Sequence, residues 1–380
     1  MFGINFLLAA FIGAAPVFEQ VEVFEAGTNG YHTYRIPALA VTTRGTLLAF
    51  AEGRKDSSSD IGDIDLLLRR SIDGGRTWLE VQTLWNDGKN TCGNPTVVVD
   101  QSNGKIWLVV NHNRGTQQSQ SVLMAGRGNG DRTVWVMESI DDGLSWSTPL
   151  EITATVKRPD WGFYATGPGI GIQLRSGRLV IPSYFRPRLS EAATEKEILQ
   201  SSRSHIIYSD DHGISWKIGG VSEAKTNECQ LVELSDGSLL LNMRSFHERA
   251  QRAIATSNDG GLSWSSVHHD RALIEPTCQA SLISCQNPVS PAKNLLLFAN
   301  PASLKRENMT VRVSEDEGVT WRYSKVLHSG PAAYSSLGAL GDATFACLYE
   351  RSSTGEARSP YERITFARFN LEWLKAPAGR

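Results

Sequence analysis

Two arginines and an aspartate lie close together near the start of the chain. Arg35 precedes Ile36-Pro37, and Arg54 is followed by a polar loop that contains Asp60. Guanidinium groups bind carboxylates through charge-assisted hydrogen bonds, and an aspartic acid can act as a general acid or base. Because proline disfavours helical geometry in the preceding residue, Ile36 is expected to be extended, which would present Arg35 from a strand. One segment of the sequence thus contains two arginines and an aspartate that is expected to be exposed.

The overall charge argues against several kinds of partner. The chain has 380 residues, of which 41% are apolar and 21% charged, as is ordinary for a globular protein. Its net charge of −2 gives no general attraction for nucleic acid, so an anionic ligand would need a local group of arginines. His32, His112 and His247 lack metal-ligand spacing, so no metal is expected.

The cysteines do not suggest a zinc site or a disulfide framework. None of the five forms a Cys-x-x-Cys pair, and their odd number favours buried thiols. Cys278 and Cys285 are close enough in sequence to pair across a hairpin, and the sequence leaves that question open. The five are Cys92, Cys229, Cys278, Cys285 and Cys347.

The first 15 residues form an apolar stretch without lysine or arginine. The stretch is too short to span a membrane, so stable membrane insertion is not expected. It is similar to the apolar core of a signal peptide, although the basic start is missing. Residues 1–18 are interpreted as a signal or N-terminal extension, which favours an exported (periplasmic, secreted or lysosome-like) protein over a cytoplasmic one. A misassigned start or a packed strand is the alternative.

One motif, Ser-x-Asp-x-Gly-x-Thr/Ser-Trp, occurs five times and is here called the Asp-box motif. In each copy the aspartate is expected to accept hydrogen bonds from turn N–H groups, the glycine to take a positive φ, and the tryptophan to cover a β-hairpin. The motif is therefore expected to be structural. The copies are Ser71–Trp78, Ser139–Trp146, Ser209–Trp216, Ser257–Trp264 and Ser314–Trp321.

The spacing of about 50–70 residues between copies predicts one small sheet per copy. Apolar, strand-like segments lie between the copies, and only residues 189–202 are expected to be helical. The sequence predicts an all-β fold, a six-bladed β-propeller formed by five motif-bearing blades and a closing blade. Closure is expected to pair Val21–Phe24 with Ile364–Phe369, so that no sheet edge stays open. Residues 19–375 would form this single domain.

The Tyr34-Arg35-Ile36-Pro37 motif, followed by Asp60 and five Asp-box motifs, resembles the exo-α-sialidases (neuraminidases) of the bacterial and lysosomal type. The resemblance covers about Glu19 to Leu374. Each motif alone is weak evidence for the family, whereas all of them in this order form a specific combination. The resemblance implies hydrolysis of terminal α-linked sialic acids from sialylated glycans, with retention and without a cofactor. It leaves open trans-sialidase or intramolecular trans-sialidase activity, and a non-catalytic propeller that binds glycans is a further alternative.

The resemblance also implies which residues hold the sugar's carboxylate. Arg35 matches the first arginine of the family's triad, and Arg244 matches the second. Arg306 matches the third by its spacing from Asn300-Pro301, with Arg312 as a rival. Arg54 matches a further arginine near the carboxylate. Planar guanidinium groups suit bidentate carboxylate recognition.

The resemblance assigns the reaction itself to a tyrosine and several carboxyl groups. Tyr334 matches the nucleophile, and a neutral tyrosine avoids the repulsion that a carboxylate would meet at a carbon bearing a carboxylate. Glu228 matches the base that activates it, because a phenol with a pKa of about 10 is a poor nucleophile at neutral pH. Asp60 matches the acid/base, and Glu350 the carboxylate that orients Arg35.

Two further segments have open interpretations. Trp161–Gly169 is similar to a family loop near the mouth of the site, and it could instead be a turn between blades. Ile61 follows the acid and is a candidate for lining an N-acetyl pocket. The helical segment 189–202 is a candidate rim or lid of the active site, although a solvent-exposed insertion is the simpler interpretation.

Overall fold

The computed structural model describes residues 15–115, 132–190, 192–287, 292–341, 343–354 and 359–377. Antiparallel strands make up most of these residues, which confirms the predicted all-β class. The expectation for a signal peptide falls mainly on residues 1–14, which lie outside the described residues. The strands form four hydrogen-bonded sheets within the described part of the chain.

The first sheet contains two antiparallel four-stranded runs, β2–β5 and β6–β9, joined by one parallel pairing of Ile64 with Thr91. The short strand β11 also pairs with β6. The strands of this sheet are β2 (Thr33–Val41), β3 (Leu47–Arg54), β4 (Ile64–Ser71), β5 (Gln82–Trp85), β6 (Thr91–Val99), β7 (Ile106–Asn113), β8 (Thr133–Ser139), β9 (Leu150–Glu151) and β11 (Gly169–Ile170).

Two smaller sheets follow along the chain. One has the order β10-β13-β14-β15, with β12 also paired to β13, and the other has the order β16-β17-β18-β19. Their strands are β10 (Trp161–Thr166), β12 (Ile172–Gln173), β13 (Leu179–Pro187), β14 (Arg203–Ser209), β15 (Lys217–Ala224), β16 (Thr226–Glu233), β17 (Leu239–Ser245), β18 (Gln251–Ser257) and β19 (His268–Ile274).

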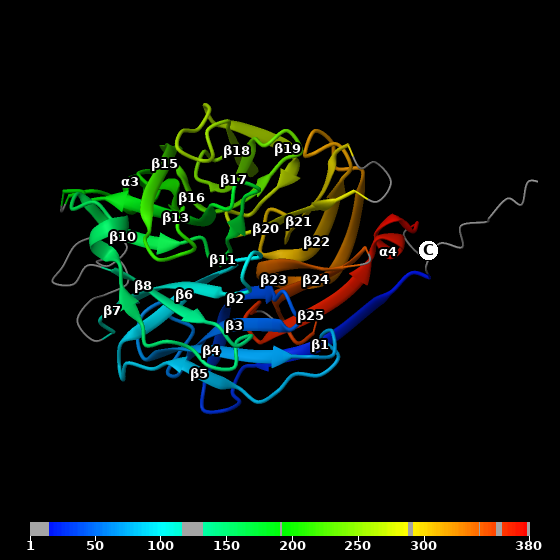
Figure 1. Cartoon of the computed structure of the whole chain (residues 1–380), viewed down its shortest axis with the longest axis horizontal. Helices are drawn as coiled ribbons and strands as arrows, with labels where there is room; N and C mark the ends of the chain where they lie inside the picture. The colour runs from blue at the N-terminus through cyan, green and yellow to red at the C-terminus, as the bar shows by residue number, and fades with distance from the viewer. Residues whose placement is uncertain are drawn as a thin grey trace, which may run out of the picture.

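The last sheet brings the two ends of the chain together. The 19-residue strand β23 pairs with β22 along its first part and with β24 along its second, so this sheet also contains two four-stranded runs. As expected, β1 pairs with β25, with Val21 opposite Phe366, and Figure 1 shows the two side by side in blue and red. The strands are β1 (Phe18–Glu25), β20 (Ser281–Gln286), β21 (Asn294–Pro301), β22 (Glu307–Ser314), β23 (Tyr323–Gly341), β24 (Thr344–Arg351) and β25 (Arg363–Asn370).

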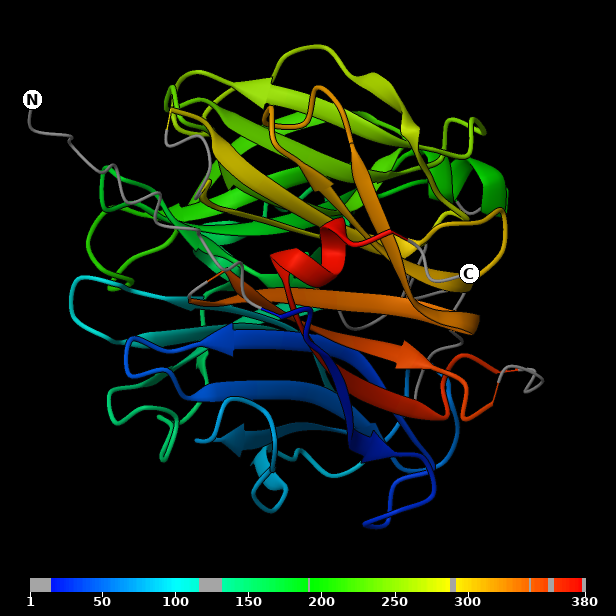
Figure 2. The same ribbon diagram turned by 90° about the vertical axis from the view of Figure 1, so that its right-hand side faces the viewer.

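The helices are short. The helix predicted in 189–202 is shorter than expected, because a capping box between Thr194 and Glu197 starts it at Glu195. An unpredicted helix begins after Asn370, whose side chain accepts a hydrogen bond from a first-turn N–H group. Figure 2 shows this helix beside the N-terminal end of β1. The helices among the described residues are α2 (Thr153–Val156), α3 (Glu195–Gln200) and α4 (Leu371–Lys375).

The Asp-box turns have the expected internal structure. In the first copy, Oδ1 of Asp73 accepts hydrogen bonds from the backbone N–H groups of Arg76 and Thr77, both at 3.0 Å. Gly75 has a φ of +88°, and a Cβ there would lie 2.1 Å from the ring of Phe366. Trp78 packs edge-on against the same ring, at 5.3 Å between centroids. In this copy the motif therefore closes its hairpin and anchors it to β25 of another sheet.

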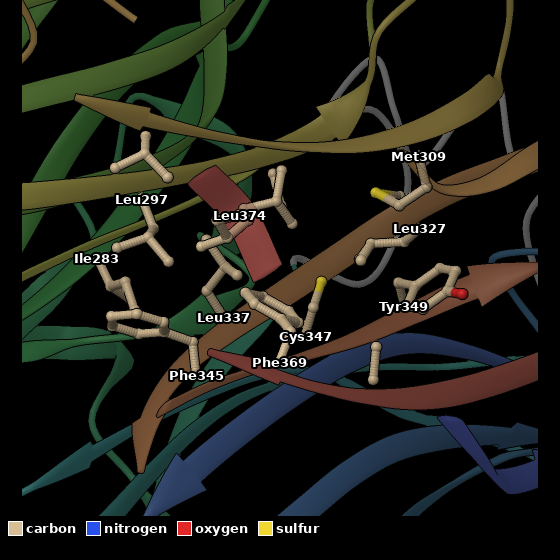
Figure 3. Packing of buried hydrophobic residues seen from close by; sticks show 14 of the residues in the cluster. Ile283, Leu297, Met309, Leu327, Leu337, Phe345, Cys347, Tyr349, Phe369 and Leu374 are labelled. Carbon is tan, nitrogen blue, oxygen red and sulfur yellow. The ribbon is translucent and has the colours of Figure 1, made fainter. Parts of the chain in front are cut away.

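The core lies between neighbouring four-stranded runs, both within a sheet and between sheets. Figure 3 shows Leu337, Phe345, Phe369 and Leu374 pointing toward one another, so that α4 covers the sheet containing β23–β25. The five cysteines are free thiols. Cys278 and Cys285 do not pair, because Cys278 precedes β20 and Cys285 lies near the end of that same strand, so no hairpin connects them.

A cavity of about 350 Å³ lies between strands of successive runs. Figure 1 shows β2, β11, β16, β20 and β23 grouped in the middle of the molecule. Apolar side chains from successive runs line the cavity: Val41, Val97, Ile172, Val232, Ile283 and Leu337. Residues that precede these on β2, β16 and β23 form the site described next.

Candidate active site

Tyr334 and Glu228 form the centre of the site. The Tyr334 hydroxyl on β23 donates a hydrogen bond of 2.5 Å to Oε1 of Glu228 on β16. Arg244 on β17 donates from Nη1 to the other carboxylate oxygen of Glu228 at 2.6 Å and to the Tyr334 oxygen at 3.3 Å. The phenol therefore has a carboxylate acceptor and a cationic donor within hydrogen-bonding reach.

The environment of Tyr334 holds its phenol in the neutral form. Burial and the negative charge of Glu228 raise its pKa well above the ordinary value, and Arg244, Arg306 and Arg35 oppose that shift without overcoming it. The three arginines favour the phenolate form, and their effect is outweighed here. Because the phenol is protonated at rest, nucleophilic attack requires proton transfer, and Glu228 is the acceptor in contact.

Glu350 fixes Arg35 in place. Nε and Nη2 of Arg35 donate to the two oxygens of Glu350 at 3.0 and 3.3 Å. Glu350 is fully buried and also accepts from the backbone N–H of Tyr334 at 3.0 Å. Burial lowers the pKa of Arg35, but the charge of Glu350 raises it further, so Arg35 stays charged. The orienting role expected for Glu350 agrees with this geometry.

The prediction that Ile36 is extended is wrong. Its φ is +60°, and the register of β2 against β3 shifts between Arg35 and Ala38. Ile36 donates its backbone N–H to Oε1 of Glu350 at 2.8 Å, so the buried carboxylate stabilises an unfavourable backbone conformation. Arg35 therefore projects from a bulge, a device that re-aims side chains.

Asp60 lies beside Arg54 and Arg35 in the loop between β3 and β4. Its Oδ1 accepts from Nη1 of Arg54 at 2.8 Å and of Arg35 at 3.5 Å. Its side chain is 42% exposed, which leaves it accessible to a ligand. Burial raises the pKa of Asp60, but the charges of Arg54 and Arg35 outweigh it and bring the pKa below its ordinary value.

A second carboxylate, which sequence reasoning missed, holds Arg54. Nε and Nη2 of Arg54 both donate to Oε2 of Glu52, at 3.0 and 2.6 Å, and both side chains are almost fully buried. Glu52 also accepts from the backbone N–H of Asn94 at 2.8 Å. Side chains alternate between the two faces of β3, so Glu52 and Arg54 lie on the same face. This alternation is the sequence pattern from which Glu52 could have been identified as a partner of Arg54.

The structure brings Arg306, and not Arg312, to Tyr334. The Arg306 guanidinium lies 5.7 Å from the centroid of the Tyr334 ring, and its Nη1 donates to the hydroxyl of Tyr361 at 2.8 Å. Arg312 instead donates to Asn300, at 3.0 Å. Burial lowers the pKa of Arg312, and the carboxylate of Asp270 opposes this. Arg35, Arg244 and Arg306 therefore surround one tyrosine.

An aromatic wall lies next to this group. The segment Trp161–Thr166, whose interpretation was open, is the buried strand β10. Its Phe163 packs with Tyr184, and Ile61 packs against them from the Asp60 loop. The guanidinium of Arg132, which sequence reasoning missed, lies 5.2 Å from the Phe163 ring centroid. Ile61 therefore lies against an apolar surface, and its lining of an N-acetyl pocket stays a prediction.

Other kinds of site are not indicated in the described part of the chain. No group of three or more histidine, cysteine, aspartate or glutamate side chains there is arranged to hold a metal ion. None of the helices among the described residues is long and apolar enough to cross a membrane. The geometry instead offers three guanidinium groups for an anion, a phenol with a base, and an accessible carboxyl group.

Comparisons with known proteins agree with this chemistry. A family model described as a BNR repeat-like domain matches residues 45–347. A sialidase of Micromonospora viridifaciens is 36% identical over 95% of this chain, and one of Bacteroides fragilis is 35% identical over 87%. The chain spans 55% and 62% of these two relatives. An exo-alpha-sialidase of Aspergillus fumigatus is 32% identical, over 95% of this chain and 92% of its own length.

Solved structures give the same result. The Hadza microbial sialidase Hz136 is 33% identical with a TM-score of 0.81, over 93% of this chain and 69% of that chain. An intramolecular trans-sialidase from Ruminococcus gnavus has a TM-score of 0.77 at 19% identity, over 93% of this chain and 98% of that chain, which shows a shared fold alone.

Proposed function

The chain belongs to the sialidase family, and we propose that it is a retaining exo-α-sialidase that removes terminal sialic acids from glycoproteins, glycolipids and oligosaccharides. The contact of the Tyr334 hydroxyl with Glu228, surrounded by three arginines, carries the proposal. It pairs a nucleophile with its base at a place built to hold an anion. The reaction needs no metal or organic cofactor.

In this proposal the arginines bind the carboxylate of the sugar. Arg35, Arg244 and Arg306 come from different sheets and converge on Tyr334. Glu350 holds Nε and Nη2 of Arg35, so Nη1 is the part of that guanidinium left to face a ligand. Guanidinium groups fixed in advance bind a carboxylate without a further ordering cost.

The first chemical step breaks the glycosidic bond. The Tyr334 oxygen attacks the anomeric carbon while Glu228 takes the phenol proton, and a covalent sialyl-enzyme forms. The departing oxygen of the glycan takes a proton from Asp60. A substrate carboxylate at Arg35 would offset part of the positive charge that lowers the pKa of Asp60. Substrate binding would thereby raise that pKa and favour the protonated acid.

The second step releases the sugar. Asp60, now ionised, takes a proton from a water molecule, whose oxygen attacks the anomeric carbon. The bond to Tyr334 breaks, and Glu228 returns the proton to the phenol oxygen. Two displacements at one carbon give net retention of configuration.

We also propose that the antiparallel runs form a six-bladed β-propeller. The cavity of about 350 Å³ supports this proposal, because residues from β2, β6, β11, β12, β16, β20 and β23, which belong to successive runs, line it. The pairing of β1 with β25 supports it as well, since it joins the two ends of the chain within one sheet. The site would then lie at one end of the central channel, and the Asp-box turns at the opposite ends of their strands. The whole of 19–375 would be one catalytic domain.

An assay with a fluorogenic sialoside tests the function. We expect the wild-type protein to release the fluorophore and the Tyr334→Phe variant to lose most of this activity. A wild-type protein without activity would favour a glycan-binding module, and a fully active Tyr334→Phe variant would contradict the mechanism. Analysis of the products by NMR separates free sialic acid from transferred or anhydro products.

A further inference from the structure

Tyr361 contacts two arginines of the proposed carboxylate site and is not part of the sequence-based site. It is half-buried, between β24 and β25. Its ring centroid lies 4.0 Å from Cζ of Arg35, and its hydroxyl accepts the hydrogen bond of 2.8 Å from Nη1 of Arg306. One side chain therefore uses its ring for one arginine and its oxygen for another.

Arg35 is held on several sides. Glu350 takes Nε and Nη2, and the Tyr334 ring centroid lies 4.9 Å from Cζ. The Tyr361 ring is the closer of the two aromatic rings. A ring that covers the guanidinium stabilises its charge and restricts its tilt. These contacts leave Nη1, whose 3.5 Å contact with Asp60 is long, as the part of Arg35 open to a ligand.

Arg306 depends more strongly on Tyr361. Within the described residues, its guanidinium makes no ion pair with a carboxylate within 4 Å, and its hydrogen bond to Tyr361 is the one that fixes it. Arg35 has Glu350 and Arg244 has Glu228, both at hydrogen-bonding distance. Arg306 is therefore the arginine of this group whose position is set by a neutral partner.

We propose that Tyr361 is a positioning residue that holds Arg35 and Arg306 at a fixed separation for the substrate carboxylate. The inference rests on the proposed function, because it gives these arginines a common ligand. Tyr361 acts through the two guanidinium groups and takes no part in bond breaking. A neutral partner suits this task, since a carboxylate beside Arg306 would compete with the substrate for it.

Three variants separate the two contacts. Tyr361→Phe keeps the ring on Arg35 and removes the hydroxyl from Arg306, whereas Tyr361→Leu removes both. Tyr323→Leu is the matched control, because Tyr323 is also partly buried beside a cation, with Arg322 at 5.6 Å from its ring, but it lies near the Asp-box end of β23. Thermal unfolding of all three shows whether each variant is folded.

Binding of an unsaturated sialic acid analogue gives the decisive readout, because it needs no turnover. We measure the affinity of its free carboxylate form and of its methyl ester by calorimetry. In the wild type, the acid should bind at least tenfold more tightly than the ester. Tyr361→Leu should lower the affinity for the acid by roughly tenfold, and Tyr361→Phe should lower it by roughly threefold. The affinity for the ester should change by less than about twofold in both variants.

The steady-state kinetics should likewise show a larger effect on substrate binding than on turnover. With a fluorogenic sialoside, Tyr361→Leu should raise KM more than it lowers kcat, and Tyr323→Leu should match the wild type. Equal losses for acid and ester, or wild-type affinity for the acid in both Tyr361 variants, would overturn the inference. If Tyr361→Leu does not fold, the ratio of acid to ester affinity in Tyr361→Phe decides. A wild type that binds the acid selectively without hydrolysing sialosides would refute the proposed function and leave the positioning role standing.

Discussion

The hydroxyl of Tyr334 lies 2.5 Å from Oε1 of Glu228, although the two residues are 106 positions apart in the chain. Their contact joins β23 to β16 at the same point where Arg244 reaches both residues. A proton can pass from the phenol to the carboxylate without rearrangement. The raised pKa of Tyr334 makes that transfer necessary, since the phenol stays protonated at neutral pH.

Asp60→Asn should affect substrates according to their leaving group. Natural sialosides leave as alkoxides and need a proton, so we expect kcat on sialyllactose to fall by roughly 10²–10⁴-fold. A nitrophenyl sialoside leaves as a stabilised phenolate, so its bond-breaking step should fall much less. Because Asp60 also acts as the base in the second step, which both substrates share, the difference is measured as kcat/KM, which reports only the steps up to the sialyl-enzyme. Equal losses of kcat/KM on the two substrates would show that Asp60 does not act as the acid.

Binding of a carboxylate ligand should draw a proton onto Asp60. In the free protein Arg54 and Arg35 hold the pKa of Asp60 below its ordinary value of 3.8 despite burial, which acts the other way. A bound carboxylate offsets part of that positive charge and raises the pKa of Asp60. Binding of the ligand therefore takes up protons, and the affinity increases as the pH falls toward the pKa of Asp60. Calorimetry in buffers of different ionisation enthalpy measures the uptake. Asp60→Asn should abolish it, and uptake that persists in this variant would assign the proton to another group.

Substitution of Arg306 should weaken substrate binding, whereas the same substitution at Arg312 should not. Arg306→Lys keeps the charge but loses the planar fork, and we expect KM to rise by roughly 10–100-fold. Arg312 contacts Asn300 instead of the site, so Arg312→Lys should keep KM within about twofold of wild type. The reverse pattern would show that the third arginine is misassigned.

The Asp-box turns should lose their stabilising effect in acid. Hydrogen bonds from the Ser145 and Ser263 side chains are the largest causes that lower the pKa of Asp141 and of Asp259, each to about 2, from 3.8. Because the folded-state pKa lies below the unfolded one, this stabilisation is complete above about pH 4 and disappears as the pH falls through about 2. Asp141→Asn should lower the Tm at pH 6 and converge with the wild type near pH 2. A constant difference in Tm between the two proteins at every pH would contradict this origin.

Local patterns in the sequence predicted the turns well, because each Asp box carries its own structure. The hydrogen bonds of Asp73, the positive φ of Gly75 and the packing of Trp78 all involve residues that the motif names or a neighbouring sheet. The conformation of Ile36 could not be predicted in this way. Its positive φ depends on Glu350, a partner 314 positions away, which overrides the local effect of the following proline.

The candidate site was likewise predicted only in part. The resemblance supplied Asp60, Glu228, Tyr334 and the arginines, and the structure places them together. Tyr361 carries no local signal, because its role comes from contacts with Arg35 on β2 and with Arg306 in the loop before β22, both distant in the chain. Helix α4 was missed because five residues are too few to show a helical period.

Mass spectrometry of the protein inactivated by a fluorinated sialic acid donor tests the central claim most directly. Fluorine beside the anomeric carbon slows breakdown of a glycosyl-enzyme, so an intermediate accumulates. We predict one covalent sugar per chain, attached through the oxygen of Tyr334, and no adduct in Tyr334→Phe. An adduct on Asp60 or Glu228, or turnover of natural sialosides with no adduct on any residue, would contradict the tyrosyl mechanism.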